Sequence, residues 1–429
     1  MILRAVLLSF FGILAFSLPI QAEPSSGSVK FDFALYFSPD PSTDPETRLT
    51  ALLAGEFQKL GTIATVDHRW EKTEDYAPPT PDAFRYRTVD LKAEQGAVIA
   101  KSKRVLVLTF SAAPTRLLET NRLAEALLAR LAEDTAGLPW DEECRFLYSI
   151  AAWRKRRVDA WQGNIPDVRG EITIDAYRNP ELVRVITLGM RKFGLPDLVF
   201  SEVASSTTRP AGNLVNACAQ RMLEGQRPEK ERFKLVLSEI KHDRMRASVI
   251  ENPYPGATGK LIFNLLPTSR EEGDPANTLW IIECPYAPGA SRMERQSSAL
   301  ASLFGSKDEM VGAKAGDPEM LAAGEKARKA FFAAAPEYRK GLQANEHLIV
   351  KTGFKIGDQT EYMWAEVIHW NIASLDCILV NDSNFDKTLR EGRRITVALK
   401  DVYDYIHSKP DGSSEGNETG KVLQSRESK

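Results

Sequence analysis

The sequence predicts an α+β protein with two units that each combine a sheet with helices, followed by a small β-rich C-terminal unit. Two observations predict this class. Segments with apolar residues at every second position, typical of strands, are interleaved with segments in which they recur every third or fourth position, typical of helices. The last part of the chain instead holds four short strand-like segments separated by glycine and asparagine turns, which indicates a curled sheet or barrel-like form.

The first 22 residues have the pattern of a cleavable signal peptide. Arg4 precedes an apolar run over residues 5–18, and the small residue Ala22 suits the cleavage site. The run is shorter than the roughly 20 residues that a membrane-spanning helix needs, and an uncleaved anchor stays an alternative. We therefore expect an exported protein, periplasmic or extracellular, that is not integral to a membrane after cleavage. Residues 23–28 are expected to be a polar linker.

The first unit, residues 29–224, begins with a strand and a capped helix. Phe31, Phe33 and Leu35 alternate with other residues over positions 29–37, which predicts a strand. Asp44 suits the N-cap of a helix over residues 45–60, which Gly61 is expected to end. Further strands are expected at 62–66, 104–110, 171–176, 182–188 and 198–203, and helices at 120–135 and 213–223.

The remaining units follow the same two patterns. The middle unit, residues 225–340, is expected to contain strands at 233–240, 260–265 and 279–284 and helices at 292–304 and 318–335. The C-terminal unit, residues 341–407, is expected to contain strands at 347–354, 362–370, 376–380 and 394–399. Residues 408–429 are polar with almost no apolar side chains, which predicts a disordered tail.

The composition excludes some classes of function. The 56 basic residues nearly balance the 58 acidic ones, which gives no reason to expect a nucleic-acid partner. The five histidines show no metal-ligand spacing, and neither a Gly-x-Ser-x-Gly elbow nor a glycine-rich nucleotide loop is present. We therefore expect no cofactor, no metal and no catalytic set readable from the sequence.

Four cysteines stand far apart in apolar surroundings and form no Cys-x-x-Cys pair. This context favours buried free thiols, whereas export leaves one or two disulfides as an alternative. The four residues are Cys144, Cys218, Cys284 and Cys377.

The C-terminal unit resembles a bacterial family known as domain of unknown function 2314. The resemblance is carried by Val350–Phe354, Tyr362–Val367, Leu379–Asp382, Gly392 with Arg394–Val397, and Asp401–Ile406. Where the family tends to have glycine and proline around its Asn-Asp turn, this chain has Cys377 and Ser383. The resemblance covers less than a fifth of the chain. It implies a separate C-terminal domain and no particular reaction.

The candidate binding residues lie in this C-terminal unit. Trp364 and Glu366 face the same side of a predicted strand, and together with Trp370 and Asp382 they suggest a groove with aromatic walls and carboxylates. The alternative places Trp364 in the core and pairs Glu366 with a basic residue. Asn381, next to Asp382, is either a turn former or part of the same site.

Three other segments combine unusual residues. The basic run Trp153–Trp161 is either a grip for an anionic partner or a solvated helix face anchored by its tryptophans. The glycines that frame residues 189–194 indicate a strained binding loop or a bulge with a turn. Asp401 and Asp404 would share a face if their segment is helical, with Asp401 as its cap.

These observations together predict a non-catalytic binding or interaction protein of the cell envelope. Its partner would be an envelope protein or a small ligand. The alternative is an envelope hydrolase with a carboxylate-based site between domains, using Glu366 and Asp382.

Overall fold

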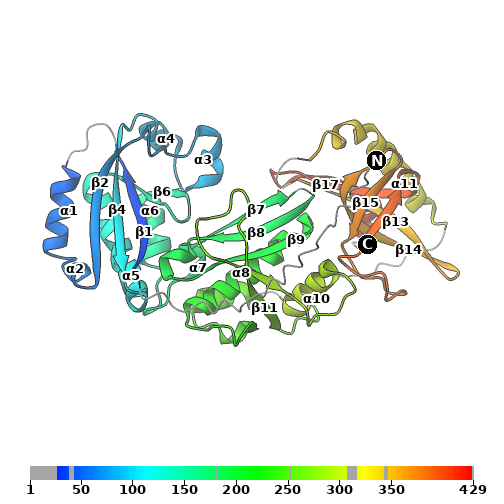
Figure 1. Cartoon of the computed structure of the whole chain (residues 1–429). Helices are drawn as coiled ribbons and strands as arrows, with labels where there is room; N and C mark the ends of the chain where they lie inside the picture. Colours follow the sequence, from blue (N-terminus) through cyan, green and yellow to red (C-terminus); the bar gives the residue numbers. More distant parts are fainter. Residues whose placement is uncertain are drawn as a thin grey trace, which may run out of the picture.

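The computed structural model describes residues 27–37, 43–179, 181–250, 253–306, 316–342 and 346–427. Within these ranges the chain forms three sheets of six strands each, with helices packed against them. The first, middle and C-terminal sheets follow one another along the molecule in chain order (Figure 1). The α+β class expected from the sequence is therefore confirmed, whereas the predicted signal peptide, residues 1–22, lies outside the described residues.

The first sheet has the strand order β2-β4-β1-β5-β6-β3. Its strands are β1 (Val29–Tyr36), β2 (Ala64–Lys72), β3 (Thr88–Val89), β4 (Arg104–Ala112), β5 (Leu138–Asp141) and β6 (Phe146–Tyr148). The helices of this unit are α1 (Pro45–Ala54), α2 (Leu60–Ile63), α3 (Pro81–Arg87), α4 (Ala93–Ile99), α5 (Leu117–Thr135) and α6 (Ile150–Trp153).

Strand β1 lies inside this sheet, between β4 and β5, because both of its faces are apolar. Phe31, Phe33 and Leu35 pack into one core together with α5 and α1. Ala34 and Tyr36 point the other way into a second, smaller core. The first sheet therefore has two distinct buried faces.

The helix predicted over residues 45–60 is wrong at its end. Helix α1 stops at Ala54, because Gly55 leaves the helical conformation with φ −115° and ψ −103°. Glycine adopts such a backbone at little steric cost. The chain resumes a helical turn only at Leu60, and both Phe57 and Leu60 still reach the same core as α1.

The middle sheet has the order β10-β11-β12-β9-β8-β7. Its strands are β7 (Thr173–Asn179), β8 (Leu182–Leu188), β9 (Asp197–Val203), β10 (Arg232–Val236), β11 (Lys260–Thr268) and β12 (Leu279–Glu283). Its helices are α7 (Val168–Glu171), α8 (Thr208–Leu223), α9 (Asp243–Ile250) and α10 (Arg292–Phe304).

The predicted division of the chain at residue 225 does not separate two sheets. Strands β7–β9 precede that position and β10–β12 follow it, yet all six belong to the middle sheet. Strand β12 pairs in parallel with β9, with Leu279 opposite Asp197. This pairing depends on residues about 80 positions apart, which no local pattern in the sequence reports.

The C-terminal sheet has the order β16-β15-β14-β13-β17-β18, with every neighbouring pair antiparallel and no closure into a barrel. Its strands are β13 (His347–Ile356), β14 (Gln359–Trp370), β15 (Ser374–Leu379), β16 (Arg394–Ala398), β17 (Val402–Ser408) and β18 (Ser414–Gly416). Helix α11 (Pro318–Tyr338) covers one face through Phe331 and Tyr338, and it continues past Pro336, the residue expected to stop it.

The prediction of a disordered tail is wrong for the described residues up to position 427. These residues form β18 and helix α12 (Glu418–Glu427), which packs on α11. The buried carboxylate of Asp404 accepts hydrogen bonds from the backbone N–H and the hydroxyl of Thr419, at 2.8 and 2.6 Å. Arg426 also bonds Asp317 and Glu319 of the α11 start. Polar bonds rather than apolar packing order the tail, which explains why composition did not predict it.

Replacing Asp404 with alanine is expected to loosen α12, because the N–H groups at the helix start lose their acceptor. We expect the free energy of unfolding to fall by about 1–3 kcal/mol and the amides of α12 to exchange faster. Denaturant unfolding and hydrogen-exchange mass spectrometry measure the two effects. Asp401→Ala is the matched control, since the Asp401 side chain is exposed. Unchanged exchange in α12 of Asp404→Ala would contradict this role.

Candidate functional site

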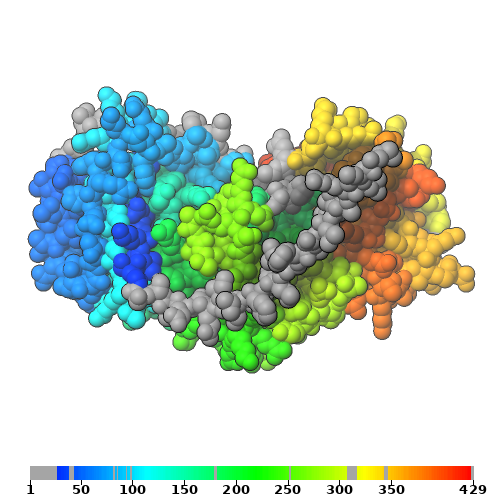
Figure 2. All heavy atoms as spheres, in the orientation of Figure 1, coloured from blue at the N-terminus to red at the C-terminus, as the bar shows by residue number. Residues whose placement is uncertain are grey.

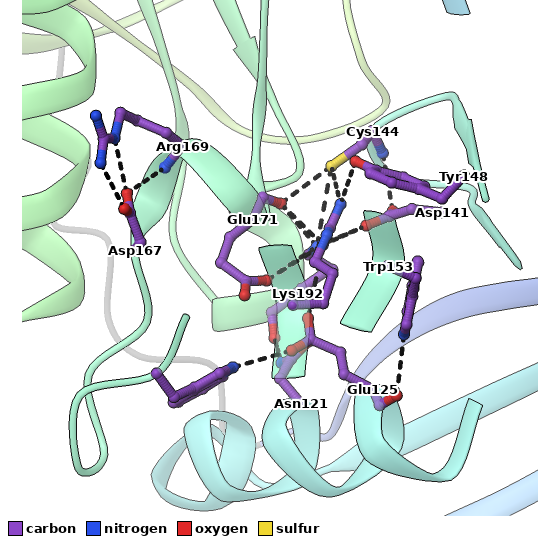
Figure 3. A network of polar contacts seen from close by, with 12 residues as sticks. Asn121, Glu125, Asp141, Cys144, Tyr148, Trp153, Asp167, Arg169, Glu171 and Lys192 are labelled. Carbon is purple, nitrogen blue, oxygen red and sulfur yellow. Dashed lines mark hydrogen bonds and ion pairs between the residues drawn. The ribbon is translucent and has the colours of Figure 1, made fainter. Parts of the chain in front are cut away.

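In the structure, the first unit is the part of the chain that carries β1–β6, and the middle unit is the part that carries β7–β12. Charged side chains meet in the interior where these two units join (Figure 3). We call this group the buried charge cluster, and its members come from α5, from the β5–β6 segment, from the turn after α6, from α7 and from the turn after β8. All six side chains are wholly inaccessible to solvent. They are Glu125, Asp141, Cys144, Arg157, Glu171 and Lys192.

Both cations of the cluster are tied to carboxylates from both units. Arg157 Nη1 lies 2.8 Å from Asp141 Oδ2 and 3.2 Å from Glu171 Oε2. Lys192 Nζ lies 2.7 Å from Asp141 Oδ2 and donates to the main-chain carbonyl of Glu171, also at 2.7 Å. Burial alone would raise the pKa of Asp141, but Lys192 and Arg157 outweigh it and hold that pKa below its usual range. Asp141 is therefore the shared anion of the cluster.

The third carboxyl group, Glu125, is held in its neutral form. Burial first, and then the neighbouring Glu171 carboxylate, raise the pKa of Glu125 well above its usual value. Among the described residues, no hydrogen-bond partner reaches Oε1 of Glu125 or Oε1 of Glu171, although Arg157 Nη1 lies 3.5 Å from Glu125 Oε1. One proton held between the two groups gives both oxygens a partner. The cluster then carries two positive and two negative charges, which is the balance that a buried site requires.

The thiol of Cys144 takes part in the cluster without becoming reactive. It donates to the carbonyl of Glu171 at 3.0 Å, and burial raises its pKa to about 12. Nucleophilic cysteines need a lowered pKa and access to a substrate, and Cys144 has neither. All four cysteines are buried and free, as favoured from the sequence. We interpret the cluster as a structural junction between the two units.

The sequence singled out two segments that build this junction, but not their purpose. In the basic run, Trp153 is buried as expected and Arg154 bonds Glu133 at the surface, whereas Arg157 lies wholly inside. Consecutive residues of an α-helix point in directions about 100° apart, so an α-helix predicted over this run directs at least one of its four basic side chains inward. This geometric signal was available in the sequence. In the structure these residues form a π-helical turn, Arg154–Val158.

The two glycines that frame residues 189–194 also serve the cluster. Gly189 and Gly194 both have positive φ, +113° and +67°, and they bracket a short turn, Met190–Phe193. This turn delivers Lys192 to the cluster, and a Cβ at Gly189 would lie 2.7 Å from the Cys144 sulfur. The strained backbone expected here therefore serves to insert Lys192 and not to bind a ligand.

Helix α5 carried a second sequence signal that was missed. Asn121 and Glu125 stand in the same stripe as Leu117 and Leu128, at helical spacings, and all four are buried. Polar side chains within an apolar stripe indicate buried partners. Asn121 donates to the carbonyl of Lys192 at 2.7 Å, which ties α5 to the turn that carries this lysine.

The turn between β5 and β6 connects the cluster to the molecular surface. Asp141 and Cys144 point into the cluster, and the Cys144 N–H donates to Asp141 Oδ1 at 3.0 Å. Glu142 and Arg145 are at least partly exposed on the same turn. Arg145 has a left-handed backbone with φ +57°, which is uncommon outside glycine, asparagine and aspartate. The cluster thus fixes the turn whose other side chains face solvent.

Those solvent-facing side chains line a hollow with a volume of about 450 Å³, which we call the β5–β6 hollow. Its volume is within the range of small-molecule sites, about 300–1,000 Å³. The other wall is the proline-rich segment that leads into α3. The lining residues are Asp75, Tyr76, Ala77, Pro78, Pro79, Thr80, Ala83, Arg87, Trp140, Glu142 and Arg145.

Hydrogen bonds fix the walls of the hollow. Glu142 Oε2 accepts from the Tyr76 hydroxyl at 2.5 Å and from Trp140 Nε1 at 2.7 Å. Burial raises the pKa of Tyr76, with the Glu142 carboxylate adding to the effect, and the phenol therefore stays neutral. Arg87 makes a forked pair with Asp175 of the middle sheet, at 3.1 and 2.9 Å. The hollow is therefore formed before any ligand arrives.

The middle unit also reaches this hollow. Arg145 Nη1 donates to the carbonyl of Gly273, in the loop between β11 and β12, at 3.3 Å. In the space-filling view, yellow-green atoms of the middle unit lie against the first unit (Figure 2). The Asp274 carboxylate holds the same loop through Arg184 at 2.8 Å and Tyr177 at 2.6 Å. Both units thus contribute to the surroundings of the hollow.

The structure does not bring the predicted groove together. Glu366 is buried and accepts from the N–H groups of Ser205 and Ser206, both at 2.9 Å, which connects the C-terminal sheet to the turn that precedes α8. Trp364 lies partly buried beside Lys351, whose ammonium is 5.1 Å from the ring centre. Backbone N–H groups thus take the place of the basic partner suggested for Glu366, since the carboxylate meets this turn.

The other predicted site residues lie elsewhere in the C-terminal sheet. Trp370 packs on Phe331 under α11, because a register shift between Val367 and His369 turns it to that face. Asn381 accepts from the Trp364 N–H at 3.0 Å. Asp382 accepts from the Glu391 N–H at 2.8 Å and so joins the two ends of the loop between β15 and β16.

The helical interpretation of Asp401 and Asp404 is wrong. The segment from Val402 to Ser408 is strand β17, and a bulge opposite Lys351 and Thr352 interrupts its register. Asp401 lies in the short turn before the strand and is exposed, while Asp404 lies in the strand and is buried. Asp404, and not Asp401, caps a helix, and that helix is α12.

The C-terminal region matches one known family. Residues 317–429 match the family described as an uncharacterized protein conserved in bacteria, domain of unknown function 2314. The resemblance predicted from the motifs is confirmed. The match also takes in α11 and the tail, and therefore extends beyond the motifs on both sides. No curated protein and no solved structure matches the chain.

Two further searches concern only the part of the chain that the structure describes. Within it, no three side chains of histidine, cysteine, aspartate or glutamate are arranged to hold a metal ion. No helix among the same residues is both long enough and apolar enough to cross a bilayer.

Glu125→Gln is expected to stabilise the protein increasingly as the pH rises. Unfolded Glu125 releases its proton near pH 4.5, whereas the folded group holds it to higher pH. The stability that this proton gives is complete below about pH 4.5 and is lost as the pH rises toward the folded pKa. Glutamine mimics the protonated group and has no such loss. Denaturant unfolding between pH 5 and 8 measures the difference between the two proteins.

Glu171→Gln is the matched control for this experiment. It removes an anion that both cations need, and we expect it to lower the free energy of unfolding by about 3–5 kcal/mol. If Glu125→Gln is as damaging as Glu171→Gln, and equally so at every pH, the shared proton is contradicted.

Proposed function

We propose that this chain is an exported, non-catalytic binding protein of the cell envelope that takes a small ligand in the β5–β6 hollow. The observation that carries the proposal is the hollow itself. It combines a volume of about 450 Å³ with aromatic and proline walls and a few polar groups, which is the usual make-up of a ligand site. Export is inferred from the signal-peptide pattern of residues 1–22.

The chemistry of the lining favours binding over catalysis. In the part of the lining that the structure describes, the hydroxyl groups belong to Thr80 and Tyr76. Thr80 Oγ1 accepts from the Ala83 N–H at the start of α3, and the Tyr76 hydroxyl donates to Glu142. None of the described residues that line the hollow is a histidine, a cysteine or a lysine. A nucleophile with an adjacent base, as covalent catalysis requires, is therefore not among these residues.

The rival proposal, a hydrolase that uses Glu366 and Asp382, receives no support from their surroundings. Both Glu366 carboxylate oxygens accept hydrogen bonds from the turn that precedes α8. Asp382 Oδ1 accepts from the backbone N–H of Glu391, nine residues further along the chain. A general acid or base must be within hydrogen-bond reach of its substrate, and these two carboxylates are instead engaged by the protein.

Filling the hollow should abolish ligand binding. Ala83→Trp places a large side chain on its α3 wall, while Ala322→Trp places the same side chain at an exposed position of helix α11. We expect fragments that bind the wild type in ligand-observed NMR to bind Ala322→Trp equally and to lose binding to Ala83→Trp. The proposal would be overturned if no fragment binds the wild type, or if the fragments bind Ala83→Trp as well as they bind the wild type.

A further inference from the structure

The hollow is lined by acidic and basic side chains that make fewer hydrogen bonds to the protein than they are able to make. Glu142 Oε2 already accepts two hydrogen bonds, whereas Oε1 of the same carboxylate accepts none from the residues that the structure describes. Asp75 is an exposed second carboxylate among the lining residues. Arg145 donates one hydrogen bond, to Gly273, out of the five that a guanidinium can make. The second arginine, Arg87, is already neutralised by Asp175.

The acidic side of the hollow suits a cation. The Glu142 carboxylate lies beside Tyr76 and Trp140, which donate to it, and their rings form part of the same wall. Carboxylates together with aromatic faces attract an ammonium group. Trp140 is only 8% exposed and is therefore a fixed part of this wall.

The basic side suits a carboxylate. The left-handed backbone of Arg145 and its hydrogen bond to the Gly273 carbonyl restrain this side chain. Its remaining N–H groups are therefore held in place for a ligand. A guanidinium can bind a carboxylate through two parallel hydrogen bonds. Glu142 and Arg145 stand three residues apart on the β5–β6 turn, and both line the hollow.

We propose that the ligand of the β5–β6 hollow is a small zwitterion with an ammonium and a carboxylate, such as an amino acid or a short peptide. The ammonium binds Glu142 Oε1 with Asp75 nearby, and the carboxylate binds Arg145. An apolar side chain of the ligand packs on Pro78, Pro79 and Trp140. This inference rests on the proposed function and adds the class of ligand to it.

Calorimetric titration of the full chain with leucyl-alanine tests the inference, with leucine as the single amino acid. N-acetyl-leucyl-alanine lacks the ammonium, and leucyl-alaninamide lacks the carboxylate. We expect each blocked dipeptide to bind about tenfold more weakly or worse, because each loses a hydrogen bond between charged groups. The ratio between leucine and leucyl-alanine distinguishes an amino-acid site from a peptide site.

Two variants assign the charges to their partners. Glu142→Gln keeps a carbonyl oxygen for Tyr76 and Trp140, so the wall is retained, and Arg145→Gln removes the guanidinium. We expect Glu142→Gln to weaken leucyl-alanine about tenfold and to leave the N-acetyl form unchanged. Arg145→Gln is expected to weaken leucyl-alanine similarly and to leave the amide unchanged. Glu325→Gln, at an exposed position of α11, is the control.

The outcomes separate this inference from the proposed function. If fragments bind in a manner that Ala83→Trp blocks, but leucine and leucyl-alanine do not bind, the zwitterion is wrong and the binding site stands. The same holds if the dipeptides bind and neither charge variant changes their affinity. If Ala83→Trp leaves the affinity for the dipeptides unchanged as well, both the inference and the site are overturned.

Discussion

The ion pairs of Arg157 and Lys192 with Asp141 and Glu171 constrain the way in which the first two units are joined. Each of these charges is wholly buried, and a buried charge without its partner destabilises a protein by about 3–5 kcal/mol. The residues come from both sides of the junction, so neither unit satisfies its own charges alone. Because of this dependence, we expect the two sheets to unfold together, although the chain passes from the first to the second only once.

The same constraint reaches the surface through the β5–β6 turn. Asp141 and Cys144 anchor the turn inside, and Glu142 and Arg145 project from it into the β5–β6 hollow. A turn fixed by buried charges holds its outer side chains in place before a ligand binds, which reduces the entropy lost on binding. The junction between the middle and C-terminal sheets includes Glu366, bonded to the turn that precedes α8, and an apolar cluster to which Met293 and Ile378 belong.

Strand and helix patterns made most of the fold predictable, because apolar alternation reports which residues face a core. β1, with Phe31 and Phe33, and α10, which ends at Phe304, lie where the sequence placed them. Other features depend on contacts that no local pattern reports. The pairing of β12 with β9 unites strands from both sides of residue 225, and Asp404 orders a tail whose composition predicts disorder.

The candidate site was predicted least well, for a physical reason. Sequence patterns assign charged residues to the surface, whereas the junction buries charges from five separate segments that meet only after folding. The interior position of Glu125 was signalled by the apolar stripe of α5, and that of Arg157 by the geometry of four consecutive basic residues. The predicted groove failed for the opposite reason. Trp364 and Glu366 do share a face of β14, but a register shift turns Trp370 to the other face.

Native-state hydrogen exchange measured against denaturant concentration tests the central claim most directly. The amides to compare are those of Phe33 and Leu108 in the first sheet with those of Val185 and Phe200 in the middle sheet. If buried charges join the two sheets, all four amides exchange through one opening event, with one free energy and one dependence on denaturant. Exchange of the first-sheet pair at a clearly lower free energy, while the middle-sheet pair stays protected, would contradict the account.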